Sequence, residues 1–340
     1  MKITKVSPTL IKFSDIEGDE LARLGEILTY KDKTVEYEYN KTKKSRWAAQ
    51  QYDYAEKLAN LKANIIKSNL IEKNGEYYTH SGLADHVREN LYPFAPKSDW
   101  PTYQDEVFYP EPERVPWDLN YSPVAPRYYQ TKAAESLLEK KHGAISLPTG
   151  SGKSLCILNL VKQLGLPSVI VTPSVSIADQ LFSDFKKAFG VKYVGLFGDG
   201  KKQIKHKFTV AVAASLLKIP KGSDAESFFA GKQVLICDES HLLGADQVSR
   251  VANEVCKSSP YRFFVSATQF RNDGKDQFLE GITGPVVYEK KFGELVKEGY
   301  LSPLQFTITK VKTNSSYDNP NNPKKMAQEH FLYNPNILSV

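Results

Sequence analysis

The chain has 340 residues, of which 41% are hydrophobic and 25% are charged, so it can bury a large core and form two domains. No apolar run approaches the ~18 residues needed to span a membrane, and the first residues lack the apolar stretch of a signal peptide. The three cysteines, Cys156, Cys237 and Cys256, lie far apart in apolar surroundings, which favours core packing over a disulfide or zinc site. We therefore expect a soluble protein of a reducing, intracellular compartment.

The net charge of +6 is unevenly distributed along the chain. Residues 1–120 hold 17 basic against 20 acidic side chains, whereas residues 121–340 hold 28 against 19. A basic excess favours binding to a polyanion such as nucleic acid. An excess of this size is common in soluble proteins, so it supports nucleic-acid binding only weakly.

The first ninety residues are typical of a small mixed α+β domain. Alternating side chains predict strands at 2–6, 9–13 and 34–39, and a short helix is expected at 20–28. A longer helix is expected after Ser45, because several large apolar residues recur on one helical face. These residues are Trp47, Tyr54, Leu58, Leu61 and Ile65.

A run of basic residues precedes this helix and is followed by aromatic ones. The basic residues are Lys41, Lys43, Lys44 and Arg46, and the aromatic residues are Trp47, Tyr52 and Tyr54. Nucleic-acid surfaces combine such residues, because the basic groups pair with phosphates and the rings stack on bases. A solvated loop that leads into an amphipathic helix explains the same run, and we favour this second interpretation.

Prolines are concentrated between residues 92 and 126, where they are expected to prevent regular structure. This segment is also rich in aromatic residues, so we expect it to pack on a surface as a linker between domains. A second polar, proline-broken linker is expected at 314–325. The predicted division is an accessory domain at 1–91, a linker at 92–126, a lobe at 127–312 and a final linker at 313–340.

After residue 127 the pattern alternates between strands and helices. Short, unbroken apolar runs predict strands at 144–147, 169–172, 193–197, 209–214, 234–237 and 263–266. The clearest helix is expected at 176–189, with Gly190 as its C-cap. Apolar strands separated by helices predict an α/β fold, in which a parallel sheet is covered by helices on both faces. Ligands bind to such sheets at the carboxyl ends of the strands.

The first predicted strand of this region leads into a glycine-rich turn and then a helix. Glycines in the turn let several backbone N–H groups point at one spot, and the helix start adds positive charge, so the turn can hold phosphates. A lysine and a serine follow, which suit contacts to the β- and γ-phosphates and to Mg²⁺. The residues concerned are Pro148, Thr149, Gly150, Ser151, Gly152, Lys153 and Ser154. Leu147 stands where the usual pattern has its first glycine, and a glycine turn with a solvated lysine is the alternative interpretation.

A second chemical motif follows the apolar strand at 234–237. Asp238 is suited to bind Mg²⁺ and Glu239 to orient and activate the attacking water, and both are expected at the same sheet edge as Lys153. The alternative is an acidic strand end that meets solvent. His241 and the hydroxyls of Ser266 and Thr268 lie beyond two strand ends, and we expect His241 to form a hydrogen bond to the Ser266 loop.

Two further segments carry weaker signals. Gln130 lies upstream of the phosphate loop, and its amide could form a pair of hydrogen bonds with adenine that guanine would not accept. A glutamine at a helix start without such a role is the usual alternative. Thr172, Pro173 and Ser174 end the second strand with hydroxyl and N–H groups that suit a nucleic-acid phosphate.

In combination, these segments resemble the superfamily 2 DExH helicases, in the branch that includes XPB and phage UvsW. The matching segments are Arg127–Gln130, Leu147–Ser154, Thr172–Ser174, Asp238–His241, Ser266–Thr268 and the run from Ala267 to Gly274, in which Gln269 replaces a proline. The resemblance extends from Arg127 to about Val311 and is thin over the N-terminal domain. It implies that residues 127–312 form a RecA-like, ATP-binding P-loop lobe and that the accessory domain at 1–91 binds DNA. It also implies nucleotide contacts from Arg127 and Gln130, coupling by His241, Ser266 and Thr268, and nucleic-acid contacts from Pro173, Ser174 and Arg271.

The resemblance implies an ATP- and Mg²⁺-dependent DNA helicase or translocase, without a membrane partner, that acts on branched or forked DNA. Replication, recombination or repair in the cytoplasm of a bacterial or phage-infected cell is the implied setting. An RNA helicase and a restriction or remodelling motor that moves on duplex remain alternatives. Such helicases have a second RecA-like lobe with an arginine finger, and only 72 residues follow Thr268. The chain alone is therefore expected to bind Mg·ATP, to hydrolyse it slowly and to unwind nothing.

Overall fold

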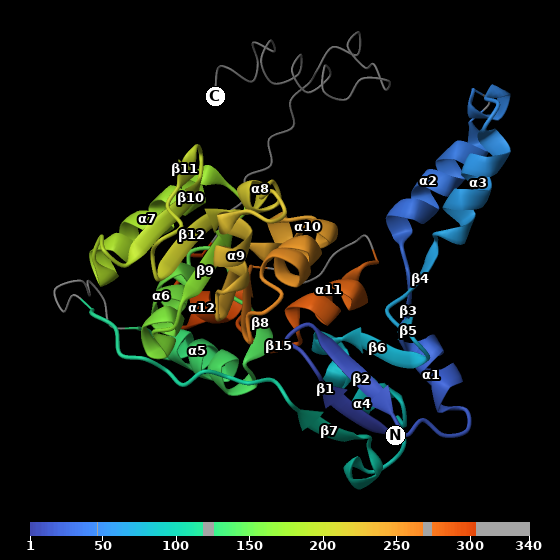
Figure 1. Cartoon of the computed structure of the whole chain (residues 1–340), viewed down its shortest axis with the longest axis horizontal. Coiled ribbons are helices and arrows are strands. Elements are labelled where there is room, and N and C mark those ends of the chain that lie inside the picture. Colours follow the sequence, from blue (N-terminus) through green and yellow to red (C-terminus); the bar gives the residue numbers. More distant parts are fainter. Residues whose placement is uncertain (46, 118–125, 268–273, 304–340) are drawn as a thin grey trace. The chain divides into compact units, whose positions relative to one another are not determined.

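The computed structural model describes residues 1–45, 47–117, 126–267 and 274–303 (Figure 1). Two sheets organise this part of the chain, one of five strands within the first 105 residues and one of eight strands between residues 142 and 289. None of the helices in the described ranges combines the length and the apolar character needed to cross a membrane.

The N-terminal sheet has the strand order β5-β6-β2-β1-β7, and only the pair β1 and β7 is parallel. Its strands are β1 (Lys2–Lys5), β2 (Leu10–Ser14), β5 (Ile71–Lys73), β6 (Glu76–His80) and β7 (Thr102–Asp105). Ile3, Ile11 and Phe13 form its core with side chains from α1 (Glu20–Ile27) and α4 (Ala84–Asn90). The predicted strands at 2–6 and 9–13 and the helix at 20–28 are confirmed, each within one or two residues.

The strand predicted at 34–39 is wrong, because these residues belong to helix α2 (Lys33–Lys44). Asp32 precedes the helix, and its carboxylate accepts hydrogen bonds from the backbone N–H groups of Thr34 and Val35 at 3.1 and 3.2 Å. This cap satisfies two of the donors that a helix start leaves open. The alternation of apolar and polar residues in the sequence predicted a strand. No α2 side chain is fully buried, so the apolar residues of this segment do not pack into the core as those of a sheet strand would.

The longer helix expected after Ser45 is divided into a 3-10 turn (Ala48–Gln50) and helix α3 (Tyr54–Ala63). Helix α3 packs against α2, and the pair is joined to the domain by a two-stranded ribbon of β3 (Thr29–Lys31) and β4 (Ile66–Ser68). We call residues 29–68 the arm. Tyr54, Leu58, Leu61 and Ile65 of the predicted apolar face are half-buried, although no residue of α3 is fully buried.

The proline-rich segment contains regular structure, contrary to the expectation. Residues 97–99 form a 3-10 turn, and β7 pairs with β1 and supplies an edge strand to the N-terminal sheet. The expectation that the segment packs on a surface is confirmed. The backbone N–H of Glu113 donates to the carbonyl of Leu164 at 2.8 Å, and the Trp117 ring meets the Phe189 ring edge-on at 5.2 Å. The domain division itself stays a prediction.

The large sheet has the order β11-β10-β12-β9-β13-β14-β8-β15, and all neighbouring strands are parallel except β10 and β11. Its strands are β8 (His142–Ser146), β9 (Ser168–Thr172), β10 (Val194–Gly198), β11 (Lys201–Lys202), β12 (Phe208–Val212), β13 (Val234–Asp238), β14 (Tyr261–Ser266) and β15 (Val286–Glu289). All six predicted strands are present. The strand expected to reach residue 214 ends at Val212, because Ala213 begins helix α8 (Ala213–Leu216), and β11 and β15 were not predicted.

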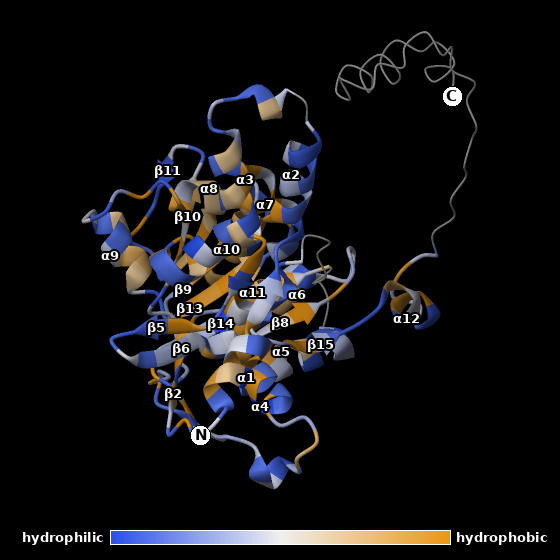
Figure 2. Ribbon diagram, turned by 90° about the vertical axis from the view of Figure 1, so that its right-hand side faces the viewer, coloured by the Kyte–Doolittle hydropathy of each residue, from blue (hydrophilic) through white to orange (hydrophobic). Residues whose placement is uncertain are grey.

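Helices cover both faces of this sheet, whose strands form the most hydrophobic part of the ribbon (Figure 2). One core contains side chains from α5 (Tyr128–Lys140), α6 (Lys153–Leu164), α7 (Val175–Phe189) and α12 (Phe292–Lys297). The other contains side chains from α8, α9 (Asp224–Ala230), α10 (Ala245–Arg250), the π-helical turn at 251–255 and α11 (Asp276–Thr283). The predicted α/β fold, with a small α+β domain before it, is therefore confirmed.

The N-terminal domain contacts the lobe at helix α11, where glycines permit close approach. A Cβ atom on Gly82 would lie 2.2 Å from the carbonyl oxygen of Glu280, closer than real Cβ contacts. The side chain of Gln277 donates to the carbonyl of Ile27 and meets the ring of His86 at 2.9 Å. The atoms closest to this Cβ position belong to the backbone of residues 280–284. A larger residue at Gly82 would therefore fit only if α11 moved away from the N-terminal domain.

We therefore expect Gly82→Ala to destabilise the chain by about 1–3 kcal/mol, the usual cost of overpacking a tight contact. Gly25→Ala is the matched control, because Gly25 lies within α1 and a Cβ there meets nothing within 4 Å. The control should be neutral or stabilising by about 0.5–1 kcal/mol. Denaturant unfolding measures both variants, and equal stability of the two would contradict the tight contact.

Candidate functional site

Three neighbouring strands end at the same edge of the large sheet. Parallel pairing sets Ser146 of β8 opposite Ser266 of β14, and Val265 of β14 opposite Asp238 of β13. The backbone N–H of Leu147 also donates to the carbonyl of Ser266 at 2.9 Å. The glycine-rich turn, the Ser266 loop and the acidic strand end therefore meet at one place, as the sequence predicted.

The glycine-rich turn has the backbone geometry of a phosphate cradle. Gly150 and Gly152 have φ angles of 83° and 81°, which other residues rarely adopt, and Gly152 caps the start of α6. A Cβ on Gly152 would also lie 2.4 Å from the Gln130 amide nitrogen. The side chain of Ser151 is fully buried, and its hydroxyl lacks a hydrogen-bond partner among the described residues. Such an unpaired buried hydroxyl fits a site that accepts a polar ligand.

Lys153 joins the turn to the acidic strand end. Its ammonium lies 2.9 Å from the Glu239 carboxylate and 3.4 Å from the carbonyl oxygen of Leu147. Only 8% of Lys153 and 4% of Asp238 are exposed to solvent. The two alternative interpretations, a solvated lysine and an acidic strand end in solvent, are therefore wrong.

The acidic pair is held in a strained and poorly solvated position. Glu239 has a left-handed backbone with a φ of 47°, and its N–H donates to the Asp238 carboxylate at 3.0 Å. Burial, with the negative charge of Glu239 beside it, raises the pKa of Asp238 from 3.8 to about 6, although Lys153 opposes this shift. A bound cation would stabilise the ionised form of Asp238, so the raised pKa suits a metal ligand.

His241 connects the acidic pair to the neighbouring strand end. Its Nδ1 atom lies 2.8 Å from the Ser266 hydroxyl and 3.3 Å from the Glu239 carboxylate. The hydrogen bond expected between His241 and Ser266 is therefore present. Its role in coupling stays a prediction, and Thr268 lies outside the described residues.

The start of α5 supports the turn from the other side. The carbonyl of Ser151 accepts hydrogen bonds from the Tyr129 hydroxyl and the Gln130 amide, both at 2.7 Å. The Gln130 oxygen accepts from the N–H of Arg127 at 2.8 Å, and the Arg127 guanidinium lies 5.1 Å from the centre of the Tyr300 ring. Both ends of the Gln130 amide therefore contact the protein itself, and its role in reading adenine stays a prediction.

Two further residues complete this support, and neither was assigned a role from the sequence. Tyr129 fixes the direction of the Ser151 carbonyl, and Tyr300 both accepts a hydrogen bond from Arg127 and stacks with it. Tyr129 stands between two residues that were singled out, so its position offered a signal. Tyr300 comes from a distant segment, and nothing in its local sequence indicates the contact.

The remaining candidate residues of the sequence analysis form few side-chain contacts among the described residues. Ser154 is half-buried in the first turn of α6, next to Lys153. Ser174 caps helix α7, because its hydroxyl accepts from the N–H of Ile177 at 3.5 Å, and Pro173 precedes it. Arg271 lies outside the described residues. In the described ranges, no cluster of three or more His, Cys, Asp or Glu side chains is arranged to hold a metal ion.

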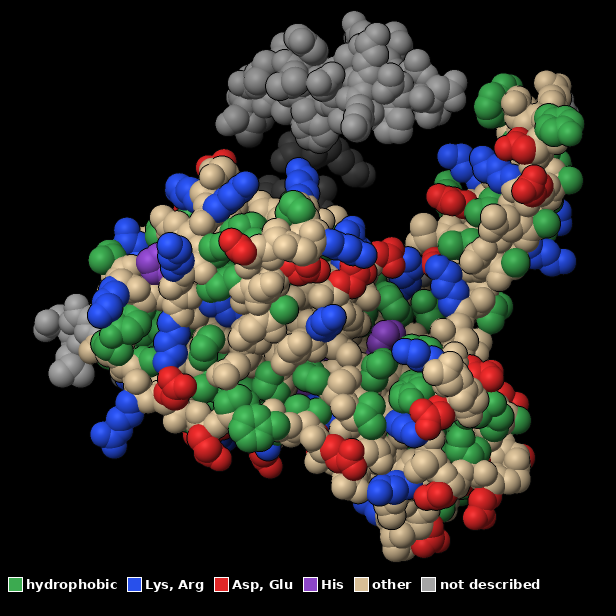
Figure 3. All heavy atoms as spheres, viewed as in Figure 1, with side chains coloured by type: hydrophobic (Ala, Val, Ile, Leu, Met, Phe, Trp, Pro, Cys, Tyr) green, Lys and Arg blue, Asp and Glu red, His purple; other side chains and the backbone are tan. Residues whose placement is uncertain are grey.

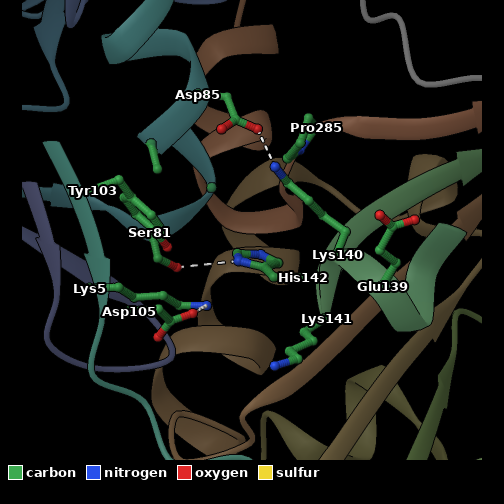
Figure 4. Close-up of a pocket in the computed structure, with 12 residues that line it drawn as sticks. Lys5, Ser81, Asp85, Tyr103, Asp105, Glu139, Lys140, Lys141, His142 and Pro285 are labelled. Atoms are coloured by element: carbon green, nitrogen blue, oxygen red, sulfur yellow. Dashed lines mark hydrogen bonds and ion pairs between the residues drawn. The ribbon is translucent and has the colours of Figure 1, made fainter. Parts of the chain in front are cut away.

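A separate cavity of about 210 Å³ lies where the N-terminal domain meets the lobe (Figure 4). Its charged side chains largely pair with one another, since Lys140 forms an ion pair with Asp85 and the Lys5 ammonium lies 3.8 Å from the Asp105 carboxylate. His142, also in its lining, is the first residue of β8 and therefore lies at the end of the strand away from the phosphate turn. This cavity belongs to the domain contact and not to the candidate site.

Comparisons with known proteins agree with this geometry. Residues 123–271 match the family model described as Type III restriction enzyme, res subunit. A DNA 3'-5' translocase XPB2 from Sulfurisphaera tokodaii is 30% identical over 183 residues, 54% of this chain and 40% of its own length. A putative ATP-dependent RNA helicase of Acanthamoeba polyphaga mimivirus is 27% identical over 206 residues, 59% of this chain and 39% of its own length. The chain thus spans about 40% of the length of these relatives.

The fold of most of the chain is also similar to that of a solved structure. The crystal structure of the UvsW helicase from bacteriophage T4 has a TM-score of 0.61, with 85% of this chain and 100% of that chain covered. The two sequences are only 15% identical, so the match concerns the fold. The match includes part of the N-terminal region as well as the lobe, because the lobe alone is shorter than 85% of the chain.

The buried position of Asp238 predicts how stability depends on pH. Because its pKa in the folded chain, about 6, lies above the ordinary 3.8, ionisation costs stability as the pH rises from about 4 to 7. The shift corresponds to about 3 kcal/mol at neutral pH. Asp238→Asn should therefore stabilise the chain at pH 7.5 in the presence of a chelator, and this gain should disappear near pH 4.

Denaturant unfolding at several pH values measures this effect. Asp53→Asn is the control, because Asp53 is exposed on the arm. It should change stability little at either pH. A loss of stability in Asp238→Asn at pH 7.5 would show that the carboxylate stabilises the fold and would contradict the account.

Proposed function

We propose that this chain is an ATP-dependent DNA helicase or translocase of superfamily 2. The observation that carries the proposal is the meeting of Lys153 with Glu239 at 2.9 Å, beside a glycine turn that has the geometry of a phosphate cradle. Hydrolysis of ATP needs both parts, one to bind the phosphates and one to act on water. The DNA substrate is proposed from the relatives, because the chain spans only part of their length.

The N–H groups of the turn and the Lys153 ammonium bind the phosphates of ATP in this proposal. Ser154 and Asp238 would hold Mg²⁺, which neutralises phosphate charge during the reaction. Their oxygens are the ligand type that Mg²⁺ prefers, and phosphate and water oxygens complete its usual six positions. Arg127 and Gln130 stand beside the turn, and we propose that Gln130 makes ATP preferred over GTP.

Glu239 and Lys153 exchange partners during this cycle. A phosphate in the turn competes with Glu239 for the Lys153 ammonium, because both are negative groups within reach of the same cation. A Glu239 carboxylate released from Lys153 can accept a proton from the attacking water. His241 contacts both Glu239 and Ser266, so a change at Glu239 reaches the end of β14.

The relatives favour DNA over RNA as the polymer. The archaeal relative is a DNA 3'-5' translocase, whereas the mimivirus relative is a putative RNA helicase of lower identity. We further propose branched or forked DNA in replication, recombination or repair, in the cytoplasm of a bacterial or phage-infected cell, from the resemblance of the sequence motifs to the branch that includes XPB and phage UvsW. Pro173, Ser174 and Arg271 are the proposed nucleic-acid contacts of the lobe.

Two variants test the nucleotide site. Lys153→Ala should weaken Mg·ATP binding at least tenfold, because it removes the charge that faces the phosphates, while thermal unfolding shows that the fold survives. Lys162→Ala, on an exposed position of the same helix α6, is the control and should bind normally. Glu239→Gln should bind ATP but lose hydrolysis about 100-fold or more, as expected when a general base is removed. Unchanged ATP binding in Lys153→Ala would refute the site.

The choice of polymer is tested by stimulation of ATP hydrolysis. Single-stranded and forked DNA should each stimulate hydrolysis by the wild-type chain, and RNA of the same sequence should stimulate it less. Stimulation by RNA alone would favour the RNA helicase. Stimulation by duplex DNA alone would favour a motor that translocates on duplex.

A further inference from the structure

The arm extends from the N-terminal domain without contributing to its core. Neither α2 nor α3 contains a fully buried residue, although the arm carries several large aromatic side chains. The exposed fractions of Tyr37, Trp47 and Tyr52 are 67%, 73% and 107%. A folded chain usually covers such rings, so three exposed ones in a single element indicate that it contacts a partner.

The charge of the arm is opposite to that of the region around it. Residues 29–68 hold nine basic and five acidic side chains, whereas the rest of residues 1–120 holds eight basic and fifteen acidic ones. The distal part, residues 41–52, has four basic residues and no acidic one. Basic and hydrophobic side chains both stand exposed on the arm (Figure 3). This charge selects a negatively charged partner.

The base of the arm contacts the lobe at the start of α11. The Asp32 carboxylate lies 3.4 Å from the ammonium of Lys275, which directly precedes α11. The rings of Tyr30 and Phe278 stack with their centres 6.1 Å apart, and a Cβ on Gly274 would lie 2.4 Å from the carbonyl oxygen of Lys31. A force on the arm would therefore reach α11, which packs against β14.

We propose that the distal part of the arm binds single-stranded nucleic acid, with bases stacked on Trp47 and Tyr52 and phosphates paired with Lys41, Lys43 and Lys44. Stacking requires bases whose faces are free, which a single strand offers and an intact duplex does not. The basic residues directly precede the rings in the sequence, so both can contact one strand. This inference rests on the proposed function, because it places part of the proposed DNA substrate on the arm.

The test measures binding of the full chain to a fluorescent deoxythymidine oligonucleotide. Replacing both Trp47 and Tyr52 by Ala should weaken binding about 30-fold or more, since each stacked base contributes at least about fivefold. Phe94→Ala is the matched control, because Phe94 is fully exposed but lies outside the arm, and it should bind as the wild type does. Thermal unfolding should be unchanged in both, since none of these rings is buried.

A second variant tests the phosphate contacts. Replacing Lys41, Lys43 and Lys44 by Ala should reduce the slope of log affinity against log salt by about 2, as expected when three single-strand phosphate contacts are lost. Mg·ATP binding should be unaffected in every arm variant, because the arm contributes no side chain to the nucleotide site.

The outcomes separate the two proposals. Failure of the wild-type chain to bind any DNA would refute the proposed function. Normal single-strand binding by the wild type and by both arm variants would overturn only the role of the arm. If the arm variants lost binding to duplex DNA only, the proposed role of the arm in single-strand binding would also be overturned. The same holds if the arm bound a protein partner and not DNA.

Discussion

The parallel pairing of β8, β14 and β13 is the constraint on which the site depends. Hydrogen bonds along these strands place Ser146 opposite Ser266 and Val265 opposite Asp238. A shift of one residue in either pairing would move an acidic or hydroxyl side chain to the other face of the sheet. The phosphate turn, the acidic pair and the Ser266 loop are distant in sequence and meet only because these strands end at one level.

The site retains polar groups that an ordinary core would avoid. Ser151 is fully buried with an unpaired hydroxyl, and Asp238 is buried beside a second carboxylate. Burial of such groups costs stability unless a partner satisfies them. The rest of the lobe offsets this cost with two hydrophobic cores, one on each face of the sheet. The stability of the two cores thus keeps these polar groups buried, where a charged ligand can form the interactions that they lack.

The lobe was predictable from sequence because its strands are buried on both faces. Such strands are continuous apolar runs, and the six predicted ones were all found, whereas β15 is half-exposed and carries no such signal. The residues of the phosphate turn were predictable because their spacing reflects backbone geometry. The contact of Lys153 with Glu239 followed from the topology, since both lie at carboxyl ends of strands in one parallel sheet.

The N-terminal region was less predictable, for physical reasons. Residues 34–39 alternate like a strand, but Asp32 caps a helix there, and a local cap outweighed a weak pattern. The strand β7 depends on pairing with β1, a contact between residues about 100 positions apart that local sequence does not record. Gly82 showed no sign of its role, because the atoms that exclude a side chain belong to α11.

The most direct test of the account is a crystal structure of the chain with Mg²⁺ and a non-hydrolysable ATP analogue. The account predicts that the phosphates lie in the turn formed by residues 148–153, that the Lys153 ammonium contacts them, and that Glu239 no longer pairs with Lys153. Phosphates bound elsewhere, or in the turn with the pair of Lys153 and Glu239 intact, would contradict it.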